Sequence, residues 1–310
     1  MTDADRIRPG VVRTIVVTEL RRFKRPWVPL ALLVWILVSV WRTVYGAETD
    51  GTPEVISSTA YVVRVNPETS DAMYAVFEYL SVWWHVNSIH LLVPLVGLVL
   101  GYELIVTERE RGRLQTSFLL PARRSTMIVG WYIARGVVLA VVLTVPLVVG
   151  WVLITSRFET GDPVAYAIFT VATVGYGLAW LSIGVAVSAA AQSARQAATV
   201  VAVLYCYQLV PIHHLIVSGD PLYQLQLLDP RHAYLTVATA PYEHLFPRLH
   251  TNVAHDVYNW ESTRWRTTFT SEEIPAYLSW PVGVAILLSW IVLPLVYAAR
   301  NVADTELVSQ

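Results

Sequence analysis

The chain is 310 residues long, and 55% of it is hydrophobic whereas only 15% is charged. A soluble domain usually carries about a quarter charged residues, so this composition excludes an ordinary soluble protein. The net charge of −1 gives no support to nucleic-acid binding, and the single cysteine, Cys206, excludes an intramolecular disulfide and a cysteine-based metal site.

The apolar residues gather in runs of about 20, the length that an α-helix needs to cross a bilayer core of roughly 30 Å. We therefore predict an all-α, polytopic membrane protein, with residues 1–310 forming a single transmembrane domain. The expected spans are residues 27–45, 84–106, 131–155, 164–190, 197–217 and 277–299. Aromatic residues near several span ends fit the belts that form at membrane interfaces.

The segment before the first span, residues 1–26, is rich in arginine, and apolar residues recur in it near helical spacing. This pattern predicts an amphipathic helix that lies in the membrane interface and contacts lipid. A basic, loosely ordered tail is the other interpretation.

Most of the 22 lysine and arginine residues fall in this segment or near the loop between the second and third spans. The positive-inside rule then predicts a multi-pass protein of the cell membrane with both termini in the cytoplasm. Residues 46–83 and 218–276 become extracytoplasmic loops. The second loop contains prolines that predict short helices and turns packed over the outer mouth, among them Pro221, Pro230, Pro241 and Pro247.

The loop between the second and third spans lies within residues 101–135 and is dense in charge. We call this loop the elbow. Gly112 marks its bend, and Leu114, Phe118 and Leu119 share one side of a short helix that Pro121 would end. The charges alternate in sign, which suits a surface that faces a partner. An ordinary loop whose arginines only fix the topology is the alternative.

Two groups of polar residues invite a more specific interpretation. Glu103 lies at the inner end of the second span, where we expect an ion pair with Arg135 or with a basic residue of the N-terminal helix. Histidines gather between residues 213 and 255, and among them His250 and His255 are the candidates for a copper or zinc site. Solvated or packing histidines are the simpler interpretation, and we predict no metal.

The fourth span carries small residues at close spacing, which predict tight helix packing. The packing could occur within the chain or against a second copy. These residues are Gly175, Gly177, Ala179, Gly184 and Ala186.

The elbow also resembles the cytoplasmic loop of type-2 ABC exporter permeases, in particular the prokaryotic group associated with copper-enzyme maturation. The matching residues are Gly101-Tyr102, Glu108-Arg109-Glu110, Gly112, Leu119-Leu120-Pro121, Arg124, Gly130 and Arg135. The resemblance implies a coupling helix between spans two and three that docks on a cytoplasmic ATPase. The residues it assigns to coupling are Glu108, Arg109, Glu110, Gly112, Leu119, Pro121 and Arg124.

The resemblance further implies a permease subunit that forms a translocation path with a second copy or a sister permease. A Walker A loop needs a glycine-rich turn before a lysine, and the only lysine, Lys24, has no such turn before it. The chain is therefore expected to be no enzyme and to hold no cofactor, with ATP and Mg²⁺ bound by a separate subunit. Two other interpretations remain open: a membrane enzyme or metal-handling protein that uses the outer histidines, and a scaffold for a cytoplasmic partner.

Overall fold

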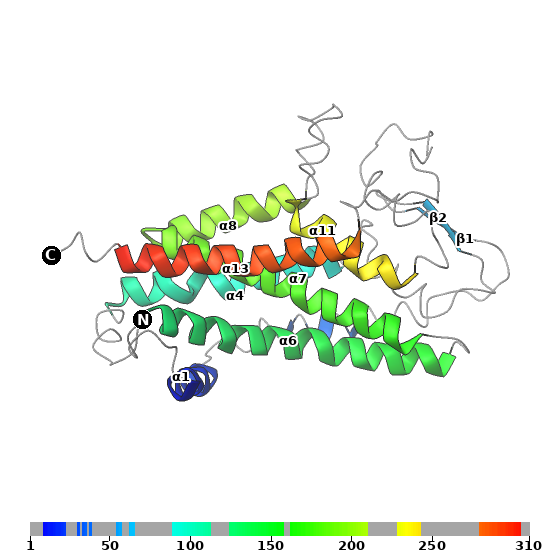
Figure 1. The fold of residues 1–310 in the computed structure, drawn as a ribbon, viewed down its shortest axis with the longest axis horizontal. Helices are drawn as coiled ribbons and strands as arrows, with labels where there is room; N and C mark the ends of the chain where they lie inside the picture. Colours follow the sequence, from blue (N-terminus) through cyan, green and yellow to red (C-terminus); the bar gives the residue numbers. More distant parts are fainter. Residues whose placement is uncertain are drawn as a thin grey trace, which may run out of the picture.

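The computed structural model is a bundle of helices with one short antiparallel hairpin (Figure 1). It describes residues 9–22, 30–31, 33–35, 37–38, 54–57, 62–65, 89–112, 124–157, 162–209, 228–242 and 279–304. The helices in this part are α1 (Pro9–Arg22), α4 (Ile89–Glu110), α6 (Arg124–Arg157), α7 (Pro163–Ala190), α8 (Ala194–Leu209), α11 (Pro230–Thr239) and α13 (Trp280–Asp304), and the 3-10 helix η4 (Ala240–Tyr242) follows α11.

The hairpin lies within the segment expected to be the first outer loop. It joins β1 (Glu54–Ser57) to β2 (Val62–Val65), with Glu54 opposite Val65 and Ser57 opposite Val62. The described positions between residues 30 and 38, inside the first expected span, are helical.

Three helices of the described part are long and apolar enough to cross a membrane, namely those at Ser125–Leu153, Pro163–Ala190 and Trp280–Val302. They fall on the third, fourth and sixth expected spans, and α4 and α8 overlap the second and fifth. A count of six membrane spans stays a prediction. Helices α4, α7 and α13 all end at the same end of the bundle. We call it the elbow end, and we call the opposite end the far end.

The start of α7 agrees with the expected fourth span because the local sequence defines it. Asp162 accepts hydrogen bonds from the amides of Val164 (2.8 Å) and Ala165 (3.2 Å), and Pro163 occupies the first turn. An aspartate cap followed by proline is a strong start for a helix, since proline has no amide to leave unpaired.

The start of α6 differs from the expected third span. The helix begins at Arg124 rather than at Trp131, so it is one to two turns longer than the apolar run. Polar residues 125 and 126 interrupt the run, yet Thr126, Met127 and Ile128 are all buried. Tertiary packing therefore extends the helix beyond the segment that hydropathy alone selects.

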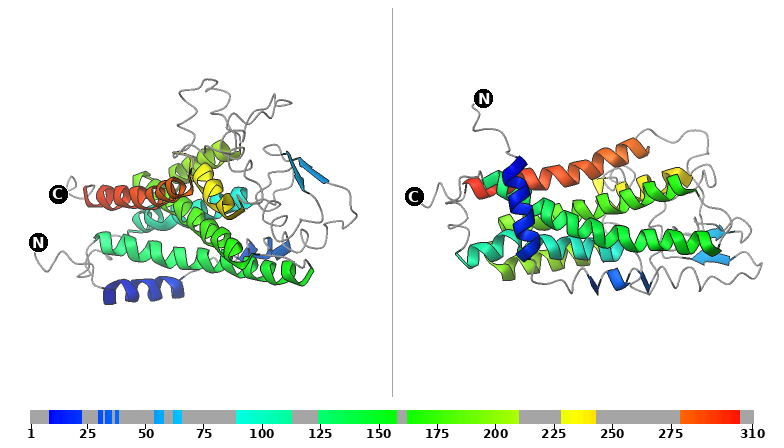
Figure 2. Two further views of the ribbon diagram at one scale, coloured as in Figure 1. Left: turned by 45° about the vertical axis from the view of Figure 1, so that its right-hand side comes forward. Right: turned by 90° about the horizontal axis from the view of Figure 1, so that it is seen from below.

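Helix α1 lies across the elbow end, close to perpendicular to the long helices (Figures 1 and 2). Its Ile15 packs on α6, where a Cβ added to Gly130 would lie 2.8 Å from the Ile15 Cγ2. Val17 and Leu20 are exposed and leave an apolar strip on the helix. This orientation fits the helix that we expected in the membrane interface.

The closest helix contact in the bundle is the crossing of α4 and α7, where glycines remove the side chains. A Cβ on Gly101 of α4 would lie 2.6 Å from the carbonyl oxygen of Leu181 in α7. A Cβ on Gly184 of α7 would lie 2.9 Å from the carbonyl oxygen of Leu98 in α4. The small residues of the fourth span therefore pack within the chain at Gly177 and Gly184, whereas Gly175 has open space around it.

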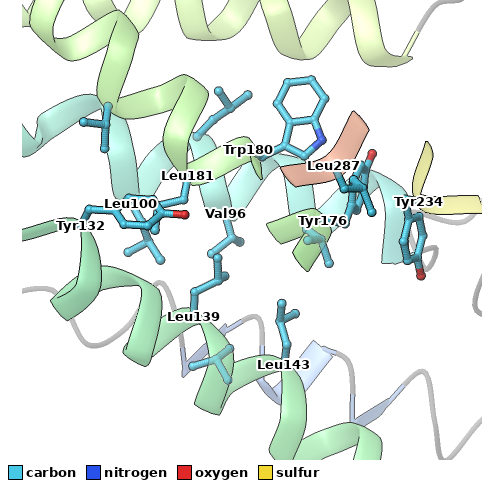
Figure 3. Packing of buried hydrophobic residues seen from close by; sticks show 14 of the residues in the cluster. Val96, Leu100, Tyr132, Leu139, Leu143, Tyr176, Trp180, Leu181, Tyr234 and Leu287 are labelled. Atoms are coloured by element: carbon cyan, nitrogen blue, oxygen red, sulfur yellow. The ribbon is translucent and has the colours of Figure 1, made fainter. Parts of the chain in front are cut away.

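Ser188 extends this crossing by one turn toward the elbow end. Its Oγ, buried between the helices, accepts hydrogen bonds from the amides of Ile105 (2.9 Å) and Val106 (3.0 Å). Around the crossing, leucines of α6 and aromatic residues of α7 fill the core (Figure 3). The core residues labelled there include Leu139, Leu143, Tyr176, Trp180, Leu181 and Leu287.

At the far end, the short helix α11 packs against α7 and α13; Asp229 caps it and Pro230 is its first residue. The ring of Tyr234 stacks on Tyr176 with centroids 4.6 Å apart, and its hydroxyl lies 3.0 Å from the Thr173 Oγ1. Burial raises the pKa of Tyr234, more than the Thr173 hydrogen bond lowers it, so the ring stays uncharged. The arrangement of the second outer loop over the outer mouth stays a prediction, because only residues 228–242 of it are described.

We predict that Gly184→Ala destabilises the protein, because its Cβ would press on backbone atoms that cannot move aside. The expected cost is about 1–3 kcal/mol, as for other overpacked cores. Gly175→Ala, in the same helix, is the matched control. It fills open space and replaces a residue that disfavours helix by about 1 kcal/mol, so stability should stay equal or rise.

Thermal unfolding in detergent, followed by tryptophan fluorescence, compares the two variants with the parent. A melting temperature for Gly184→Ala equal to that of Gly175→Ala would show that the crossing tolerates a methyl group.

Candidate coupling site

The elbow begins where α4 ends, and Gly112 ends the helix. The Gly112 backbone has a φ of 67°, in the left-handed region that glycine adopts most readily, and its amide donates to the Arg109 carbonyl oxygen at 3.0 Å. The amide of Arg111 donates to the Thr107 carbonyl oxygen at 3.1 Å. Gly112 therefore turns the chain out of the helix, where the sequence places the bend.

Arg109 binds the C-terminal end of α7. Its Nη1 donates to the carbonyl oxygen of Ala191 at 2.7 Å, and its Nη2 donates to that of Ala189 at 3.2 Å. These carbonyls lie where a helix leaves its last oxygens unpaired and carries partial negative charge, so a guanidinium is favourable there. The planar fork of the side chain permits both bonds at once.

Glu110, the next residue, binds the opposite pole of the neighbouring helix. Its Oε1 accepts a hydrogen bond from the amide of Ala194 at 2.7 Å, at the first residue of α8. A carboxylate is favourable at a helix N-terminus, where free amides carry partial positive charge. Two adjacent residues of opposite charge thus bind the two ends of the turn between α7 and α8.

Helix α13 reaches the same place. The Nδ2 of Asn301 donates to the Ala189 carbonyl oxygen at 2.9 Å, so this oxygen accepts from Arg109 and from Asn301. We call the set of Arg109, Glu110, Asn301 and the Ala189–Ala194 turn the junction. It connects the end of α4 with α7, α8 and α13.

Glu108 and Arg111 take a different position. They form an i, i+3 ion pair at 3.8 Å, with 29% and 53% of their side chains exposed. A pair this exposed contributes little to stability, about 0–1 kcal/mol, which leaves its charges available to a partner. The structure therefore divides by partner the charged run that the sequence analysis treated as one surface. Arg109 and the exposed Glu110 bind backbone groups of neighbouring helices, whereas Glu108 and Arg111 pair with each other within α4.

The N-terminal helix is attached near the start of α6. The Nη2 of Arg135 lies 3.1 Å from the Oε1 of Glu19 in α1, and each side chain is 20% exposed. Glu103 accepts a hydrogen bond from the hydroxyl of Tyr102 at 2.9 Å. The structure thus supplies Arg135 with an acid from α1, and the ion pair expected between Glu103 and Arg135 stays a prediction.

Of the remaining candidate residues, the structure describes one and leaves four outside the described part. Arg124 is the first residue of α6, on the far side of the elbow from Gly112. Leu119 and Pro121, and both candidate metal ligands, His250 and His255, lie outside the described residues. Within the described residues, no group of three histidine, cysteine, aspartate or glutamate side chains could hold a metal ion.

The sequence analysis missed Glu19 and Asn301. Glu19 is the one acid in an otherwise basic and apolar helix, a signal that could have identified it as the partner of a buried arginine. Asn301 binds a backbone oxygen 112 positions away, and side-chain patterns give no indication of such a partner.

Comparison with known proteins adds one finding. A family model described as ABC-2 family transporter protein matches residues 14–303, which is nearly the whole chain. No curated protein matches the chain.

We predict that Glu19→Gln loosens α1, because it removes one charge of a half-buried pair that contributes about 1 kcal/mol. Trypsin cleavage after Arg21 or Arg22 should then become several times faster in the purified protein. The combined exchange Glu19→Arg with Arg135→Glu should restore slow cleavage after Arg21 and Arg22, which mass spectrometry separates from cleavage at the new arginine. Equal cleavage rates in the parent, the single variant and the exchange would contradict a docked α1.

Proposed function

The chain belongs to the ABC-2 family of transporter proteins, and from that premise we propose the details of its work as a transport permease. In this proposal the chain exports its substrate, lies in the cell membrane with both termini in the cytoplasm, and couples to a separate ATPase subunit. A second copy or a sister permease completes the translocation path.

The observation that carries the proposal is the outward-facing pair of Glu108 and Arg111 at the elbow end. These charges sit on the last turn of α4, directly before the bend at Gly112, and they are not needed to hold the bundle together. Exposed charges of both signs on a rigid helix end suit recognition of a partner protein, since they steer and orient association.

A separate ATPase is part of the proposal because the sequence contains no Walker A loop. Nucleotide-driven movement of that subunit would displace the elbow, and α4 would move with it. Because the glycine crossing holds α4 directly against the backbone of α7, a tilt of α4 carries α7 along. This is coupling through packed elements that have two positions.

The docking proposal is tested with a charge exchange that spares the junction. In the double variant Glu108→Arg with Arg111→Glu, the two side chains can still form an ion pair inside α4. The charge that each position presents to a partner is reversed in sign. We expect the amount of ATPase that co-purifies from native membranes to fall about tenfold, because like charges now oppose each other. Ser156→Lys, exposed near the far end, is the control and should retain the ATPase.

Retention of the ATPase at parental levels in the charge exchange would remove the elbow as its docking site. If the parent itself captures no ATPase, the chain acts as a scaffold or in another role.

The orientation is tested with single cysteines in a Cys206→Ala background. A membrane-impermeant maleimide should label Arg111→Cys only in inverted vesicles and Ser156→Cys only in right-side-out vesicles, since the two sites lie at opposite ends of the bundle. The reverse pattern would overturn the proposed topology.

A further inference from the structure

We propose that Arg109 and Glu110 are positioning residues that make α4, α7 and the start of α8 move as one body. This inference rests on the proposed coupling to an ATPase and deepens it. It assigns the route by which movement of the elbow enters the bundle.

The first step of the argument is the chemistry of the junction. Arg109 neutralises the end of α7 through two carbonyl oxygens, and Glu110 neutralises the start of α8 through one amide. Charge-assisted bonds are about twice as strong as neutral ones. A turn of only three residues separates the two helices, so both of its ends are held by consecutive residues of α4.

The second step is that α4 and α7 are joined at two separate levels. The glycine crossing, with Gly101 against Leu181, fixes the helices near their middle. The junction fixes them again at the elbow end, beyond the Ser188 hydrogen bonds. Two packed helices that touch at one level can pivot about it. The second level, where the side chains of Ser188 and Arg109 bond backbone groups of the opposite helix, opposes this pivot.

The third step is that α6, the other side of the elbow, contacts α7 away from the junction. The Tyr132 hydroxyl donates to the Leu178 carbonyl oxygen at 3.1 Å, and the Tyr166 hydroxyl donates to the Leu147 carbonyl oxygen at 2.9 Å. A Cβ on Gly136 would meet the Cδ2 atoms of Leu178 and Leu181. These contacts lie outside the turn between α7 and α8, so movement of α4 reaches that turn through Arg109 and Glu110.

Asn301 adds α13 to the moving block. It donates to the Ala189 oxygen that Arg109 also uses, and Ser182 of α7 donates to the Ile291 carbonyl oxygen of α13 at 2.9 Å. The helix at the end of the chain is thus tied to α7 at two levels, as α4 is.

The test measures amide hydrogen exchange in the full-length permease and in its complex with the co-purified ATPase. In the permease alone, Arg109→Ala should speed exchange of peptides covering residues 189–200 at least about tenfold, because the turn loses its charged partner. Arg109→Lys, which retains the charge and one bond, should give an intermediate rate. Arg111→Ala is the matched control, since this arginine contacts a residue of its own helix, and should leave the turn protected.

In the complex, a nonhydrolysable ATP analogue with Mg²⁺ should change exchange in α7 and α8 of the parent. In Arg109→Ala that change should disappear, although the ATPase still co-purifies and hydrolyses ATP. If Arg109 only stabilised the fold, its loss would weaken ATPase binding and hydrolysis together with the nucleotide response.

The proposal is overturned if Arg109→Ala leaves residues 189–200 as protected as in the parent, or if the nucleotide response persists in this variant. A parent that binds no ATPase would instead defeat the proposed function, and exchange in the permease alone would still decide whether the junction holds the turn.

Discussion

Backbone-to-backbone packing of α4 on α7 is the constraint on which the remaining structure depends. Gly101 and Gly184 bring the helices so close that any side chain at either position would meet main-chain atoms. In a membrane, helices gain little from burying apolar surface, so such close van der Waals contact is a principal source of association. The core leucines, the aromatic stack under α11 and the junction are all arranged around this pair.

The charges at the elbow end serve three separate purposes. Arg109 and Glu110 satisfy backbone groups that helix ends leave unpaired. Glu19 and Arg135 attach a crosswise helix to the bundle. Glu108 and Arg111 pair with each other within α4 and stay partly exposed. The chain can therefore expose charges at this end without weakening the contacts that hold its own helices.

Local signals explain what the sequence could predict and long-range contacts explain what it could not. The start of α7 was predictable because Asp162 and Pro163 define it within one turn. The early start of α6 was not, because burial of Met127 and Ile128 depends on distant segments. The small residues of α7 indicated close packing but not its partner. The roles of Arg109 and Glu110 were hidden because their partners are backbone atoms more than 80 positions away.

The attachment of α1 has a consequence for how the protein is made. Glu19 and Arg135 are separated by 116 positions, so the ribosome completes α1 long before its partner on α6 exists. At about 10 residues per second, roughly ten seconds pass between the two. During that interval the helix must rest elsewhere, and its exposed Val17 and Leu20 suit it to wait on the lipid surface. Glu19 can form its ion pair with Arg135 only after this part of α6 has been synthesised, so this contact of α1 with the bundle is a late step of folding.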